Sequence, residues 1–225
     1  MFNFEVDSHV RDLTVGLVEA QGVTIGAASE QLRAACTDVV QKVREQGMAG
    51  GEPRREAVRQ MIRAGGFKPS GRNKPAQEYL LRTATETNEL PSILNVVDWI
   101  NAVSLGSGLP ISLLSAMNIG PRVLIRYGKP GETFVFNRSG QELGLEGLIC
   151  ICAATDAASI SLGTPIKDSM LGKVTEPDTD TFSFVYAPSS VVTNDEMMRW
   201  CDELARGFKQ FCGASGVETR MITTN

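Results

Sequence analysis

The stretch LPSILNVVDWINAVSL, residues 90–105, decides the fold class of this chain. Its apolar side chains recur at helical spacing on most sides, which predicts a helix that protein covers on several faces. Pro91 suits the start of this helix, and the glycines and proline of residues 106–110 end it. Helical patterns precede the stretch and strand patterns follow it, so the sequence predicts an α+β protein.

Capping residues and turn residues set the limits of the other elements. Ser29 is the expected N-cap of the first helix and Gly47 its end, while Asn194 is the expected N-cap of the last helix and Gly213 its end. The predicted helices cover residues 29–46, 53–64, 75–85, 90–105 and 194–212. The predicted strands cover residues 12–19, 22–25, 122–127, 132–136, 148–154, 181–186 and 217–223. Because no repeat or linker divides them, residues 1–225 are expected to form one domain.

The composition is that of an ordinary globular protein. Hydrophobic residues make up 42% of the chain and charged residues 21%, with a net charge of −4. No apolar run reaches the roughly 18 residues that a membrane span needs. The acidic start, MFNFEVD, lacks the cationic region of a secretory signal, so a cytoplasmic location without membrane contact is expected.

Histidine and cysteine usage excludes several classes of site. His9 is the single histidine and lies near a terminus, which argues against a Ser-His-Asp triad or a histidine-rich metal site. Cys150 and Cys152 lie in an apolar run typical of a buried strand, and no second cysteine pair completes a metal-ligand set. We therefore expect neither a metal nor a cofactor.

Residues 53–82 concentrate positive charge on an otherwise acidic chain. They hold eight basic and two acidic residues, and their Gly- and Pro-rich part, residues 65–75, is predicted to be a loop. A cationic loop on an acidic protein points to an anionic partner such as an RNA backbone. A solvated surface is the alternative, since Arg55, Arg59 and Arg63 share one helical face near a C-terminus that stabilises cations without a partner.

The segment LGTPIKDSM, residues 162–170, places three consecutive polar residues in an apolar neighbourhood. Gly163 and Pro165 predict a tight bend before Lys167, Asp168 and Ser169. Binding groups often lie on loops that a rigid sheet positions. A plain turn with a local hydrogen bond from Asp168 is the alternative.

Three segments carry a family resemblance. Residues 97–101, VDWIN, with Leu105, Gly108 and Pro110, resemble the VDxxNxxxLxxGxP stretch of the B3/B4 domain, the editing module of the phenylalanyl-tRNA synthetase beta subunit. Residues 132–149 resemble the hairpin that follows in that domain. Residues 163–169, GTPIKDS, and 67–75, FKPSGRNKP, resemble signatures of free-standing B3/B4 proteins. The resemblance covers approximately residues 58–188.

This resemblance implies a three-layer fold, in which helices pack on a β-sandwich of mostly antiparallel strands. It also implies a pocket for an amino acid esterified to the 3′ end of tRNA, and hydrolysis of misacylated tRNA in trans. The positions implied to bind this substrate are Asn101, Ser112, Gly163, Thr164 and Ser169. The basic segment then contributes phosphate contacts, for which the candidates are Lys68, Arg72, Asn73, Lys74 and Arg82.

Ser112 occupies the position at which the synthetase motif usually carries a histidine. Hydrolysis of an activated aminoacyl ester is still feasible, through a water held by fixed polar groups or by the ribose hydroxyl. Lys167 and Asp168 are the catalytic candidates: Lys167 to hold the terminal phosphate or polarise the carbonyl, and Asp168 to bind the substrate ammonium. Backbone N–H groups near Gly163 and Thr164 are candidates for stabilising the oxyanion.

Two alternatives to the deacylase stay open. One is a non-catalytic module that binds an amino acid, an aminoacyl-tRNA or a small carboxylate. The other is a small-molecule enzyme that reuses the pocket. The expected partner is tRNA, and the sequence is compatible with a monomer or a homodimer.

Overall fold

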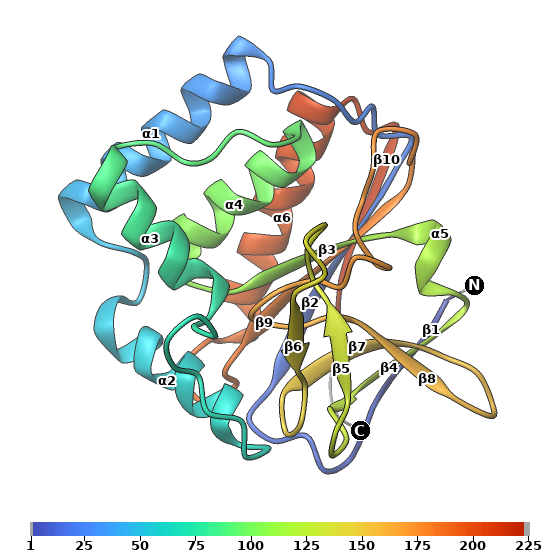
Figure 1. The fold of residues 1–225 in the computed structure, drawn as a ribbon. Coiled ribbons are helices and arrows are strands. Elements are labelled where there is room, and N and C mark those ends of the chain that lie inside the picture. Colours follow the sequence, from blue (N-terminus) through green and yellow to red (C-terminus); the bar gives the residue numbers. More distant parts are fainter. Residues whose placement is uncertain (1, 223–225) are drawn as a thin grey trace.

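The computed structural model describes residues 2–222 and stacks a layer of helices on two β-sheets (Figure 1). Helices α4 and α6 contact the first sheet directly, and α1 and α3 pack on the outer side of α4. The helices are α1 (Glu30–Gln46), α2 (Gly51–Arg63), α3 (Ala76–Thr87), α4 (Asn95–Ser107), α5 (Ala116–Ile119) and α6 (Asn194–Cys212).

The first sheet lies in the middle of the molecule and has the order β10-β2-β9-β3, with every pair antiparallel. Its strands are β2 (Thr14–Gln21), β3 (Ile111–Ser115), β9 (Thr181–Ala187) and β10 (Gly216–Ile222). This order makes β3 an edge strand, and the segment after β8 runs beside it, with an isolated bridge between Leu114 and Lys173.

The second sheet forms the outer layer and has the order β1-β4-β7-β8. Its β1–β4 pair is parallel and the other pairs are antiparallel. Its strands are β1 (Asn3–Val6), β4 (Arg122–Tyr127), β7 (Ile149–Ala154) and β8 (Ser159–Gly163), and a separate hairpin joins β5 (Thr133–Val135) to β6 (Glu142–Gly144). The expected α+β architecture, a sandwich of mostly antiparallel strands with packed helices, is confirmed.

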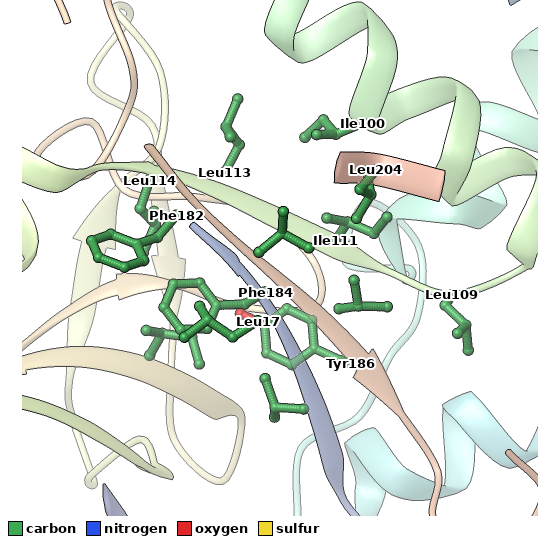
Figure 2. Close-up of a cluster of buried hydrophobic side chains, with 14 of the residues drawn as sticks. Leu17, Ile100, Leu109, Ile111, Leu113, Leu114, Phe182, Phe184, Tyr186 and Leu204 are labelled. Carbon is green, nitrogen blue, oxygen red and sulfur yellow. The ribbon is translucent and has the colours of Figure 1, made fainter. Parts of the chain in front are cut away.

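Alternating side chains place apolar groups on both faces of the central sheet. Figure 2 shows Leu113 pointing from β3 towards Ile100 of α4, whereas Phe182 and Phe184 lie on the opposite side. On that opposite side Phe4 of β1 lies 6.1 Å from Phe182 and 6.3 Å from Phe184, measured between ring centroids. The central sheet is therefore buried on both faces, and β3 forms the floor beneath α4.

Most helix ends follow the sequence prediction, but α4 begins at Asn95, with Leu94 as its N-cap, and not at Pro91. Ser29 caps α1 by accepting a hydrogen bond from the Leu32 N–H at 3.2 Å, and α1 and α6 end at Gly47 and Gly213. The cap of α6 is Thr193, one residue before the predicted Asn194, because the Thr193 hydroxyl accepts from the Glu196 N–H.

The strand prediction at residues 22–25 is wrong. The N–H groups of Val23 and Thr24 donate to Thr179 and Cys212, two separate segments, so no ladder with one neighbouring strand forms. Local patterns did not predict strands β1, β3, β6 and β8 or helix α5, although β6 lies in the hairpin that the family resemblance implied for residues 132–149. Thr223, the predicted end of the last strand, lies outside the described residues.

Within residues 2–222, no helix has both the length and the apolar character to cross a membrane.

Candidate functional site

A pocket of about 270 Å³ opens between α4, β3 and the segment 164–174. We call it the Asp168 pocket. Its helix side is apolar and presents Ile93, Leu94, Val97 and Ile100, with Asn101 as the polar exception. Its floor comes from β3, and the segment 164–174 contributes the charged groups, Lys167, Asp168 and Lys173.

The Asp168 carboxylate is the acidic group of this pocket. Its Oδ2 accepts a hydrogen bond from the Leu113 N–H at 3.1 Å, which caps the open edge of β3. Its Oδ1 is buried and has no hydrogen-bond partner among the described residues. Burial raises the pKa of Asp168 to about 6, although the Ser112 hydroxyl and the Leu113 N–H partly oppose that rise. The Oδ1 atom thus makes no hydrogen bond within the described residues, and a cation or donor that reached it would stabilise the ionised carboxylate.

Lys167 lies at the edge of the same pocket, next to an aromatic ring. Its Nζ is 3.8 Å from the centroid of the Phe136 ring, a cation–π contact. Burial and the nearby Arg72 guanidinium lower the pKa of Lys167. Lys173 lines the pocket too and donates from its Nζ to the Phe136 carbonyl at 2.6 Å. Two ammonium groups therefore flank the loop that carries Phe136.

Thr164 holds the bend that presents these residues. Its hydroxyl donates to the Lys167 carbonyl at 2.8 Å and accepts from the N–H groups of Ile166 and Lys167. Gly163 leaves room for a close approach, because a Cβ there would lie 3.0 Å from the Ser112 Oγ and 3.1 Å from the Asp168 Oδ1. The Gly-Thr-Pro sequence thus fixes the backbone on which Lys167 and Asp168 sit.

The structure separates the predicted substrate residues into two groups. Asn101 and Thr164 line the Asp168 pocket together with Lys167 and Asp168. Ser112, Gly163 and Ser169 are buried beside the pocket without lining it. The Ser112 hydroxyl donates to the Thr164 carbonyl at 3.1 Å, and the Ser169 N–H donates to the Leu162 carbonyl at 2.7 Å. Ser112 also shares a 2.9 Å hydrogen bond with the Tyr186 hydroxyl.

The basic loop lies beside the predicted bend. The N–H of Ala76, which lines the Asp168 pocket, donates to the Pro165 carbonyl at 3.0 Å. Lys68, Arg72 and Lys74 are exposed and make no ion pair with any described residue, while the Asn73 N–H closes a turn on the Ser70 carbonyl. Two segments that the sequence singled out separately are therefore joined by a backbone hydrogen bond.

Much of the positive charge of residues 53–82 is engaged within the protein. The Arg59 guanidinium pairs with both carboxylate oxygens of Glu78 at 2.6 Å, which links α2 to α3. Arg54 is buried and pairs with Glu196 at 2.5 Å, and Arg82 pairs with Glu86 at 2.8 Å. Arg55 and Arg63 pair with Glu52 and Glu56. The cations without such partners are thus concentrated in the loop before α3.

Histidine and cysteine side chains take no part in the pocket. His9 is exposed and contacts Asp7 at 2.7 Å. Burial raises the pKa of Cys150 and of Cys152, so both thiols stay protonated. Residues 2–222 contain no cluster of three or more His, Cys, Asp or Glu side chains suited to a metal ion.

A larger hollow of about 610 Å³ lies between α1, α4, α6 and the loop after α1. Its walls include Trp99 and Trp200, and its charged residues are Lys42, which is exposed, and Glu203. Because its lining contains no buried titratable group, the Asp168 pocket is the better candidate for chemistry.

Sequence reasoning missed most of the pocket wall. The helix-side residues Ile93, Leu94 and Val97 carry no polar signal, and β3, which supplies Ile111 and Leu113, was not predicted. The motif at residues 97–101 was the available signal, since it placed Val97 and Asn101 one helical turn apart.

Comparison with known proteins gives a likeness of fold. No family model matches this sequence, and neither does any curated protein. Among solved structures, the chain resembles an N-terminal fragment of the phenylalanyl-tRNA synthetase beta subunit from Pyrococcus horikoshii, with a TM-score of 0.47 and 13% sequence identity. The match covers 97% of this chain and 50% of that one, so the chain spans about half the length of its structural neighbour. The relationship is a distant one of fold.

Proposed function

We propose that the Asp168 pocket binds the aminoacyl group at the 3′ end of tRNA, and that the protein hydrolyses misacylated aminoacyl-tRNA in trans. One observation carries the proposal: a buried carboxylate with an unpartnered oxygen lies in a small aliphatic pocket that has an ammonium group at its edge. A free α-ammonium is the natural partner of such a carboxylate, because a buried charge is costly unless it is paired.

The other groups of the pocket and of the basic loop contact the remaining parts of the substrate. The amino-acid side chain packs against the helix side of the pocket, and the ester carbonyl or the terminal phosphate meets Lys167. Lys68, Arg72 and Lys74 neutralise phosphates further along the RNA, which positions the strand without reading its sequence. Arg72 is close enough to Lys167 to lower the pKa of Lys167, so the positive charge of the loop lies near the edge of the pocket.

Hydrolysis on this arrangement proceeds by attack of a water on the ester carbonyl. Lys167 stabilises the developing oxyanion, the bond between the acyl carbon and the ribose oxygen breaks, and the ribose oxygen takes up the proton that the water loses. Asp168 holds the ammonium and so fixes the carbonyl for attack. No step uses an imidazole.

The second candidate is a module that binds the same ligand without cleaving it. Two contacts favour it: the Asp168 Oδ2 is committed to the Leu113 N–H, and the Ser112 hydroxyl, which replaces the family histidine, is committed to the Thr164 carbonyl. The Ser112 hydroxyl is a far weaker base than an imidazole, and an Asp168 carboxylate that pairs with the substrate ammonium is not free to take a proton from water.

A deacylation screen separates these candidates. Purified protein is mixed with a panel of aminoacyl-tRNA pairs, correct and mischarged, and the loss of labelled amino acid is followed. The deacylase predicts faster loss from at least one mischarged pair and a decrease of about 100-fold or more in Lys167→Ala. Lys209→Ala, which removes an exposed lysine of α6, is the matched control and keeps the activity. Tight binding of aminoacyl-tRNA without any loss of label would establish the binding module and refute the deacylase.

A further inference from the structure

We infer that the Asp168 pocket selects amino acids with aliphatic side chains, with Val97 and Ile93 on α4 and its approach as specificity-determining residues. This inference rests on the proposed function, because it names the class of aminoacyl group that the same pocket takes.

The two sides of the pocket differ in chemistry. The charged groups Lys167, Asp168 and Lys173 all belong to the segment 164–174. The opposite side presents Ile93, Leu94, Val97 and Ile100, with the Asn101 amide as its polar exception and without an aromatic ring or a charge. A bound amino acid is thereby oriented, with its ammonium towards Asp168 and its side chain towards α4.

The apolar surface continues into the floor. Ile111 and Leu113 of β3 lie beneath the pocket and are nearly fully buried, as are Ile100 and Ile166. Leu113 and Ile100 both line the pocket, and Figure 2 shows them on the same side of β3, the side on which α4 lies. A ligand side chain that enters this space leaves water for aliphatic surroundings, so each methylene adds affinity and an unpaired hydroxyl or charge loses it.

The size of the pocket limits what enters. A volume of about 270 Å³ is at or below the range of roughly 300–1,000 Å³ that is typical of sites for larger ligands. One amino-acid side chain fits, whereas the terminal nucleotide must remain outside, near Lys167. Ile93 is 59% exposed and forms the rim. A substitution at this rim can therefore alter selectivity without opening the core.

A homologous series of amino-acid amides tests the inference without RNA. The amides of alanine, 2-aminobutyric acid, norvaline and norleucine keep the ammonium and the carbonyl and differ only in methylene count. Titration calorimetry on the full chain is expected to show about a fourfold gain in affinity for each added methylene. Valinamide is expected to bind at least about tenfold more tightly than threoninamide, its near-isostere. A flat series, or equal binding of valinamide and threoninamide, would overturn the inference.

Matched variants localise the effect. Val97→Asn and Ile93→Asn place an amide on the helix side and are expected to flatten the series. Val191→Asn makes the same replacement as Val97→Asn at an exposed valine away from the pocket, and it keeps the series unchanged. Ile93 is mostly exposed, so Ile93→Asn is expected to fold normally. It therefore tests the inference even if Val97→Asn destabilises the protein. If both pocket variants kept the gain in affinity for each added methylene, Val97 and Ile93 would not determine the specificity of the pocket.

The outcomes separate the inference from the proposed function. Deacylation confined to charged or hydroxylated aminoacyl groups would refute the inference and leave the function standing. Graded binding of aliphatic amides, without deacylation or binding of any aminoacyl-tRNA, would refute the function and leave the selectivity standing.

Discussion

The Asp168 Oδ2 accepts a hydrogen bond from the Leu113 N–H at 3.1 Å, while the Asp168 Oδ1 is buried and has no hydrogen-bond partner among the described residues. One oxygen therefore closes the edge of β3 while the other carries a desolvation cost. Burial raises the pKa of Asp168 to about 6, from an ordinary value of 3.8, so the ionised form is less stable in the folded protein than in the unfolded chain.

Asp168→Asn is expected to stabilise the fold at neutral and alkaline pH. The pKa of Asp168 is higher in the folded protein than in the unfolded chain, so ionised Asp168 destabilises the fold. This loss of stability is absent below the unfolded pKa, grows as the pH rises towards 6, and is constant above about 6. The variant should gain up to about 3 kcal/mol in unfolding free energy at about pH 8 and roughly half of that at about pH 5. Urea unfolding at the two pH values measures the difference.

The same variant is expected to lose ligand binding, since it removes the partner of the ammonium. A residue that costs stability and supports binding is typical of a functional site. A loss of stability at both pH values, with binding intact, would instead assign Asp168 a purely structural role at the edge of β3.

Glu132→Gln is expected to destabilise the protein by about 3–5 kcal/mol, because it leaves the nearly buried Arg126 guanidinium without its partner. Arg126 donates to both Glu132 oxygens, at 2.8 and 2.9 Å, and Ser161 donates to one of them. Burial alone would raise the pKa of Glu132, but the Arg126 guanidinium, the Lys129 N–H and Ser161 outweigh it and hold the pKa at about 2.

The pH dependence of this pair has the opposite sign to that of Asp168. The pKa of Glu132 is lower in the folded protein than in the unfolded chain, so ionised Glu132 stabilises the fold. This contribution to the free energy of unfolding is fully present above about pH 4.5 and is lost as the pH falls towards 2. Glu203→Gln, at an exposed pair with Arg206, is the control and should change stability by about 1 kcal/mol or less. Equal effects of the two variants would contradict a special role for the Arg126–Glu132 pair.

RNA binding is expected to depend on the unpaired cations of the loop before α3. In the triple variant Lys68→Ala, Arg72→Ala, Lys74→Ala, the slope of log affinity against log salt should fall by about 2 for a single strand. The measurement is fluorescence anisotropy of a labelled tRNA acceptor end across a salt series.

The control for this measurement removes the same charge elsewhere. Arg63, Arg122 and Arg206 are partly exposed, and each makes an ion pair. Replacing all three by alanine should leave the slope nearly unchanged. Equal losses in both triple variants would mean that the overall charge of the protein, and not this loop, governs RNA binding.

Local signals predicted helices α1–α4 and α6, and they identified the bend and the loop that lie beside the pocket. The turn chemistry of Gly163 and Pro165 and the Gly- and Pro-rich loop identified two segments, and the Ala76–Pro165 hydrogen bond joins them. The sequence could not show that Arg59 and Arg54 are engaged by Glu78 and Glu196, because those partners are set by the packing of separate helices.

The apolar wall depends on tertiary structure. All five residues of β3, ISLLS, are buried, so the strand lacks the alternation that identifies a half-exposed strand. Strand β1 has only four residues and gains its place by parallel pairing with β4, from residue 122 onwards. Which aliphatic side chains converge on Asp168 follows from how α4 lies over β3, and no local pattern contains that information.

The most direct test is the binding of a non-hydrolysable 3′-aminoacylamido adenosine to the wild-type protein and to Asp168→Asn. Titration calorimetry near pH 7.5 is expected to show saturable binding to the wild type and a loss of about 10- to 100-fold in the variant, because a charge-assisted hydrogen bond is removed. Equal affinity in the two proteins, or no binding to the wild type, would contradict the assignment of the Asp168 pocket to an aminoacyl group.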